Sequence, residues 1–134
     1  METAGVTEEE AQALRQGIQE FNEGYYFEAH DTLEEAWHGI RGAHRAFYHG
    51  LIQMATGFYH LTGGNLKGAE SQLSAGLRKL HPFCPACLGV DVAALVREVE
   101  GVLERMRGGN GPAEGPETLR IPLDPSALAR QVEK

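Results

Sequence analysis

The chain repeats a unit of helix, glycine turn and helix at an offset of 40 residues. Small and apolar residues occur in the same order in residues 14–37 and in residues 54–77. The matching pairs are Gly17 and Gly57, Phe21 and Leu61, Gly24 and Gly64, Ala29 and Ala69, Leu33 and Leu73, and Trp37 and Leu77. A single hairpin of this kind cannot bury its apolar face alone, so we expect the two copies to stack on each other.

Apolar periodicity predicts five helices, over residues 7–22, 25–40, 44–62, 66–80 and 92–107. Gly24 and Gly64 follow helices, at turns that favour a positive φ. Gly17 and Gly57 lie inside helices, where glycine costs about 0.5–1 kcal/mol relative to alanine, so we expect neighbouring helices to approach closely there. The predicted fold class is all-α, with two stacked antiparallel helical hairpins and a fifth helix.

The predicted helices end near residue 107, and 134 residues suit one domain. We therefore expect a single all-helical domain over residues 1–107. Residues 108–134 begin with the glycine- and proline-rich stretch "GGNGPAEGPE", which predicts a flexible linker. A C-terminal tail follows, with a short extended piece and a marginal helix.

The net charge of −7 and a pI near 5.3 argue against a surface that binds nucleic acid or anionic membranes. No apolar run approaches the roughly 18 residues that a membrane span needs. The acidic N-terminal stretch "METAGVTEEEAQ" has no apolar signal core. These features predict a cytoplasmic protein.

The second predicted helix carries a polar pair beside its core stripe. His30 and Glu34 are four residues apart, on one helix face, between Phe27 and Trp37. Asp31 is assigned to the solvent face of this helix. His30 and Glu34 are therefore boundary residues between aromatic side chains.

The third predicted helix carries a matching row of His49, Gln53 and His60 at nearly one angle. A short connection makes the second and third helices antiparallel neighbours. Counting outward from the turn places His49 and Gln53 level with the second helix's polar pair, and His60 about one and a half turns farther along. The heights match, but the rotation of the helices is open, so convergence of these side chains is a hypothesis.

A histidine and a carboxylate at i and i+4 can share a metal ion, and this donor set suits Zn²⁺, Mn²⁺ or iron. We take His30, Glu34 and His60 as candidate metal ligands. In a hydrolase, Glu34 would be ligand or general base and His60 ligand or proton shuttle. The alternative is a structural hydrogen-bond network, in which Glu34 holds His30, inside a non-catalytic helical interaction module.

The stretch "HPFCPAC" brings together His81, Cys84 and Cys87. A CxxC pair can be redox-active or can form half of a zinc site. No second CxxC is present. Incidental loop cysteines are the third interpretation.

Four blocks, "FNEGYYFEAHDTLEEAW", "FYHGLIQMATGFYH", "GNLKGA" and "GLRKL", resemble successive blocks of the bacterial and archaeal domain of unknown function family 309 over about residues 14–91. The resemblance implies a compact all-helical fold. Members of this family are often described as metal-dependent hydrolases, which implies a divalent metal for this chain. The polar positions that match the family blocks are Glu28, His30, Glu34, Arg45, Gln53, His60 and Asn65.

His49 departs from the family pattern, which usually has glutamine there. We expect either an unknown small molecule or a protein as partner, and exposed aromatic residues at the hairpin edges could support a homodimer.

Overall fold

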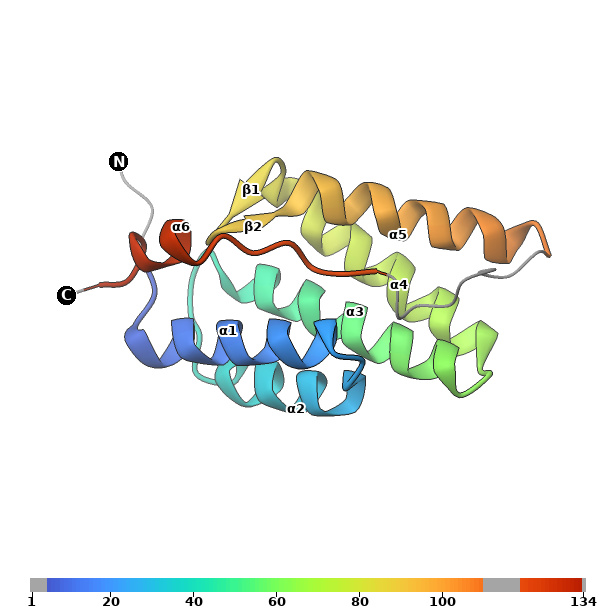
Figure 1. Cartoon of the computed structure of the whole chain (residues 1–134), viewed down its shortest axis with the longest axis horizontal. Helices are drawn as coiled ribbons and strands as arrows, with labels where there is room; N and C mark the ends of the chain where they lie inside the picture. Colours follow the sequence, from blue (N-terminus) through green and yellow to red (C-terminus); the bar gives the residue numbers. More distant parts are fainter. Residues whose placement is uncertain (1–4, 110–118, 134) are drawn as a thin grey trace.

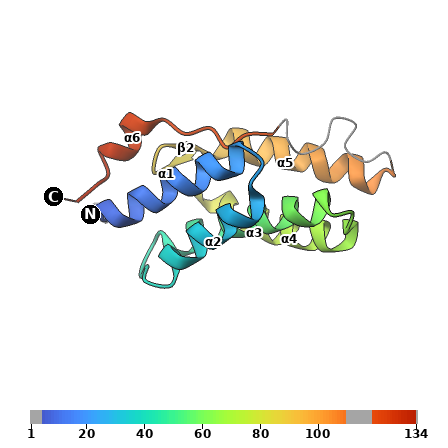
Figure 2. The same cartoon turned by 60° about the horizontal axis from the view of Figure 1, so that its bottom comes forward.

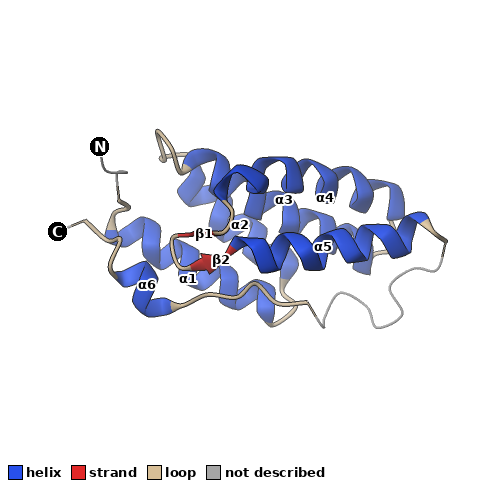
Figure 3. Cartoon of the chain, turned by 90° about the horizontal axis from the view of Figure 1, so that it is seen from above, coloured by secondary structure: helices blue, strands red, loops and turns tan. Residues whose placement is uncertain are grey.

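The computed structural model describes residues 5–109 and 119–133. The helices are α1 (Glu8–Asn22), α2 (Tyr26–Trp37), α3 (Arg45–Thr62), α4 (Leu66–Leu80), α5 (Val92–Arg107) and α6 (Pro125–Ala129). A 3₁₀ turn, η1 (His81–Phe83), precedes two short antiparallel strands, β1 (Ala86–Cys87) and β2 (Val90–Asp91). Figure 3 shows this small hairpin at the start of α5. The all-α prediction is confirmed.

The five long helices stack in the order of the sequence. Helix α2 packs on both α1 and α3, α3 packs on α4, and α4 packs on α5 (Figure 1). Helix α1 also contacts α3 directly, where the hydroxyl of Tyr48 donates a hydrogen bond to the carbonyl oxygen of Glu10 (2.8 Å). Gly24 and Gly64 have φ values of 89° and 83° at the two hairpin turns. This left-handed backbone is open to glycine without a steric penalty, as the sequence pattern predicts.

The repeat pair Gly17 and Gly57, both inside helices, make equivalent close approaches. A Cβ atom on Gly17 would lie 2.6 Å from Cγ of Leu33, and one on Gly57 would lie 2.6 Å from Cδ2 of Leu73. Leu33 and Leu73 are themselves a repeat pair and are both buried. The expected close helix–helix approach is therefore present in both hairpins.

Helix α2 ends at Trp37, three residues before the predicted end at Ile40. Nη1 of Arg45 donates hydrogen bonds to the carbonyl oxygens of Trp37 (2.8 Å) and Ile40 (2.9 Å). The guanidinium also lies 4.1 Å from the centre of the Trp37 ring. Arg45 thus donates to carbonyl oxygens at and just beyond the end of α2, and its charge complements the helix C-terminus.

Residues 119–133 lie against the helical domain, along the side of α1 (Figures 1 and 2). The side chain of Asn22 accepts a bond from the backbone nitrogen of Ile121 (2.7 Å) and donates one to its carbonyl oxygen (3.1 Å). Leu119, Ile121 and Leu128 are buried. This part of the tail therefore extends the folded unit beyond the expected boundary at residue 107, while the expected linker at 110–118 lies outside the described residues.

Within residues 5–109 and 119–133, no helix has both the length and the hydropathy needed to cross a membrane.

Candidate functional site

The polar strip of α2 lies at the edge of the α2–α3 interface. The side chain of His30 is 26% exposed, that of Glu34 41% and that of Asp31 62%. Nε2 of His30 lies 3.4 Å from Oε1 of Glu34, and Nδ1 lies 3.3 Å from Oδ1 of Asp31. Both distances exceed the roughly 2.7–2.9 Å of a short charge-assisted hydrogen bond. The imidazole is therefore flanked by two carboxylates and is not locked to either.

These three side chains can offer one ligand atom each within 4.8 Å of one another. Asp31 is not among the metal ligands predicted from the sequence, because its position belongs to the solvent face of the helix. The sequence signal for Asp31 is that it directly follows His30, so its carboxylate can approach one ring nitrogen while Glu34 approaches the other. One ring nitrogen of His30 faces each carboxylate, so a single ion can use only one of the two pairs directly.

His30 also lines a pocket of about 140 Å³ with Phe27, Thr56, Tyr59 and His60. His60 comes from the last turn of α3, so this pocket joins α2 to α3. The structure thus brings His60 to the same pocket as His30, but not into the group of close ligand atoms around Glu34.

The tautomer of His60 follows from its neighbour Asn65. Oδ1 of Asn65 accepts a hydrogen bond from the backbone nitrogen of Gly68 (2.9 Å) and caps α4. This bond orients the amide so that its Nδ2 faces Nδ1 of His60 at 3.4 Å. A donor at that place favours an unprotonated Nδ1, so a neutral His60 carries its proton on Nε2. In that state Nε2 can donate a hydrogen bond but cannot bind a metal.

His49 of α3 lies beside Trp37 of α2. Its ring centre is 4.8 Å from that of Trp37. Burial and the positive charges of Lys79 and Arg45 lower the pKa of His49, while Glu34 acts in the opposite direction. A lowered pKa keeps the imidazole neutral at pH 7, where it can accept or donate a hydrogen bond.

Two buried polar atoms near this strip have no hydrogen-bond partner within the described chain, namely Nε1 of Trp37 and Oε1 of Gln53. Gln53 packs on α4, where its Cβ lies 3.3 Å from the Cβ position of Gly76. The amide oxygen is buried, and Gln53 forms no hydrogen bond with Glu34 within the described residues. The equal heights that the sequence predicts for Gln53 and His30 do not bring these two side chains into one pocket.

Two other candidates have separate positions. Glu28 is exposed in the first turn of α2 and forms no hydrogen bond or ion pair within the described residues. Arg45 is engaged with the carbonyls at the end of α2, as described above.

The cysteine loop forms no ligand group. Cys84 is exposed and Cys87 half-buried, and both are free thiols. Burial raises the pKa of the Cys87 thiol to about 12, which is opposite to the shift that activates a catalytic thiolate. In the described part of the chain, these thiols and His81 do not come together as a metal-ligating group.

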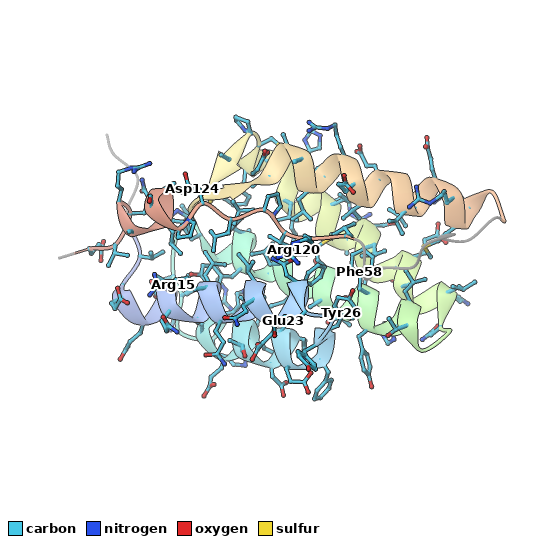
Figure 4. The ribbon with its side chains drawn as sticks, viewed as in Figure 1. Arg15, Glu23, Tyr26, Phe58, Arg120 and Asp124 are labelled. Atoms are coloured by element: carbon cyan, nitrogen blue, oxygen red, sulfur yellow. The ribbon has the colours of Figure 1, made fainter. Side chains whose placement is uncertain are left out.

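Larger clefts are wide and lie away from the α2 strip. One of about 530 Å³ runs between α1 and the C-terminal segment, with Arg15, Glu23 and Arg120 around it (Figure 4). Arg15 is paired with Glu8 at 2.7 Å, and Arg120 donates to a backbone carbonyl. The polar groups of this cleft are thus largely engaged in holding the fold.

Residues 14–72 match the family model described as "Domain of unknown function (DUF309)". These residues belong to that family. The matched stretch contains the α2 strip, the pocket shared with His60 and most of the helical repeat of this DUF309 domain. Among curated proteins, none matches the chain.

Proposed function

We propose that the DUF309 domain binds a divalent metal ion through Nε2 of His30 and the carboxylate of Glu34, as part of a metal-dependent hydrolytic site. The observation that carries the proposal is the approach of both His30 ring nitrogens to carboxylates at 3.3 and 3.4 Å. A metal-binding histidine usually gives its second ring nitrogen to a carboxylate, which fixes the ring and raises its basicity. Asp31 is in position for this orienting role.

The donor set fits a borderline ion. One imidazole and one carboxylate suit Zn²⁺, Mn²⁺ or Fe²⁺ better than they suit Ca²⁺, which prefers six or more oxygen ligands. Because Glu34 and Asp31 are 41% and 62% exposed, the site competes with bulk water and its affinity should be modest. A bound ion would supply Lewis acidity to a water molecule or to a substrate oxygen.

His60 and His49 would serve the substrate side of such a site. The Asn65 contact favours a proton on Nε2 of neutral His60, which suits Nε2 to donate a hydrogen bond to a substrate oxygen in the shared pocket. His49 stays neutral at pH 7 because its pKa is lowered. Both imidazoles are therefore available for proton transfer or hydrogen bonding.

Metal titration of untagged protein tests the proposal. Isothermal titration with Mn²⁺ and Zn²⁺ should show about one ion per chain, and His30→Ala or Glu34→Gln should each weaken binding at least tenfold. Asp31→Asn should cause a smaller loss, about tenfold for an orienting partner. His38→Ala, which removes an exposed histidine of the same region, is the matched control and should change nothing.

Metal binding that survives His30→Ala, or a stoichiometry below about a tenth of an ion per chain, contradicts the site. Hydrolysis is tested separately with p-nitrophenyl phosphate and p-nitrophenyl acetate. Turnover that needs the added ion and disappears in both Glu34→Gln and His60→Gln supports the catalytic part. Turnover that His60→Gln leaves unchanged contradicts the role of His60.

A further inference from the structure

The large hydrophobic side chains exposed within the described chain all lie at the hairpin turns. They are Tyr25 (56%), Phe27 (50%), Tyr59 (47%) and Leu66 (54%). They come from the start of α2, the last turns of α3 and the start of α4, and in Figure 1 both turns lie toward the right-hand end of the molecule. The rings of Phe27 and Tyr59 belong to different hairpins and meet with centroids 5.5 Å apart.

Phe27 and Tyr59 flank the pocket of about 140 Å³. Ligand pockets for small molecules usually measure about 300–1,000 Å³, so this one is too small for a drug-sized compound. It is suited to a single side chain inserted from outside. An aliphatic side chain or the stem of a lysine would contact the Phe27 and Tyr59 rings there.

The surface beside this pocket is strongly acidic. Residues 16–40 contain six carboxylates and no lysine or arginine, in a chain whose net charge is −7. Glu28 and Glu35 are exposed on α2 and form no ion pair within the described residues. Their repeat equivalents are Gly68 and Ala75, so the shared packing of the hairpins does not require these charges.

We infer that the Phe27–Tyr59 pocket and the acidic face of α2 form a docking surface for a lysine- or arginine-rich segment of a partner protein that inserts one apolar side chain. Charge complementarity selects this occupant. A second copy would bring an equally acidic hairpin against this one, and nucleic acids or anionic membranes would be repelled in the same way. The docking surface does not require a metal at His30, because Phe27 and Tyr59 are not among the proposed metal ligands.

The test uses two synthetic amphipathic helices of about 14 residues, with leucine on one face and either lysine or glutamate on the other. Fluorescence anisotropy of the labelled peptides is measured with the full chain at about 150 mM salt. The lysine peptide should bind and the glutamate peptide should not. Raising the salt should weaken binding, because exposed charges are screened.

Variants locate the surface. The double change Phe27→Ser and Tyr59→Ser should weaken the lysine peptide at least tenfold, whereas Tyr25→Ser, equally exposed but outside the pocket, should have little effect. Glu28→Gln with Glu35→Gln should weaken binding severalfold.

The same charge change on α5, Glu98→Gln with Glu104→Gln, should have a much smaller effect. Circular dichroism checks that each variant is folded. Metal titration of the variant with Phe27→Ser and Tyr59→Ser checks its His30 site, and the metal affinity should equal that of the unchanged chain.

Four results would overturn the inference. The first is equal binding of the glutamate peptide, and the second is unchanged binding of the lysine peptide by the Phe27 and Tyr59 variant. The third is an equal loss of binding in the α5 control, which would show that only the overall charge matters. The fourth is a dimer in sedimentation experiments that Phe27→Ser dissociates, which would assign the surface to self-association.

Discussion

Replacing Gly57 with alanine tests the close approach of α3 and α4 on which the helical repeat depends. The added Cβ would lie 2.6 Å from Cδ2 and 2.7 Å from Cγ of Leu73, and 3.3 Å from its backbone nitrogen. Rotation about χ2 moves Cδ2 but leaves Cγ in place, and Leu73 is fully buried, so a χ1 change that moves Cγ would drive the side chain into its packed neighbours. The variant can therefore relieve the overlap only by separating the two helices or by repacking Leu73.

Two opposing effects determine how much Gly57→Ala changes the free energy of unfolding. Alanine is favoured over glycine in a helix by about 0.8–1.0 kcal/mol. Overpacking a closely packed core costs about 1–3 kcal/mol, and the overlap with a fully buried Leu73 places this site at the upper end. We expect a net loss of about 1–2 kcal/mol, or a decrease in Tm of several degrees for a domain of this size.

Gly101→Ala is the matched control, because Gly101 lies inside α5 and a Cβ there meets only the end of Arg105 at 3.6 Å. This variant should gain about 0.5–1 kcal/mol from helix propensity alone. Urea unfolding followed by circular dichroism measures both variants, and Gly17→Ala should resemble Gly57→Ala because it meets Leu33 in the same way. A Gly57→Ala protein as stable as the unchanged chain would refute the packing argument.

Three further predictions concern the tail, the buried histidine and the thiols. Asn22→Ala removes both hydrogen bonds to Ile121, so it should cost about 1–3 kcal/mol and speed amide exchange in residues 119–123, measured by mass spectrometry. Burial lowers the pKa of His44 below the unfolded value of 6.5, so the unfolded state binds a proton more readily than the folded state. The contribution of His44 to stability should therefore be full above pH 6.5 and should be lost as the pH falls below that value. The decrease of Tm with falling pH should be shallower in His44→Gln. At pH 8, iodoacetamide should modify the exposed Cys84 quickly and Cys87, whose pKa is about 12, only on unfolding.

The helices could be predicted from the sequence because their apolar period and glycine turns are local signals. The packing of residues 119–133 could not, since it depends on contacts such as that between Asn22 and Ile121, which are 99 residues apart. A five-residue helix such as α6 has little stability of its own. Leu128 of this helix is buried, so the tail contributes to the core. Amino-acid composition alone does not predict this contribution.

The site could be predicted along one helix but not between helices. His30 and Glu34 are at i and i+4, so helix geometry alone places them together. Periodicity specifies the height of each α3 residue, but the rotation of α3 is decided by the close approach of its glycines to α4. That rotation buries the Gln53 oxygen and puts His60 in the pocket with His30.

Comparison of the two hairpins favours a ligand at His30 and Glu34 over a purely structural network. In the second hairpin the equivalent positions are Glu70 and Ser74, and Arg107 from the following α5 donates to them at 2.7 and 3.1 Å. Within the described residues, no side chain of α3, the helix that follows the first hairpin, forms a hydrogen bond or ion pair with His30 or Glu34. A network that served packing alone would be expected to cross to the next helix, as Arg107 does. The first hairpin instead leaves an imidazole between two carboxylates beside a small pocket, an arrangement that an added cation can complete.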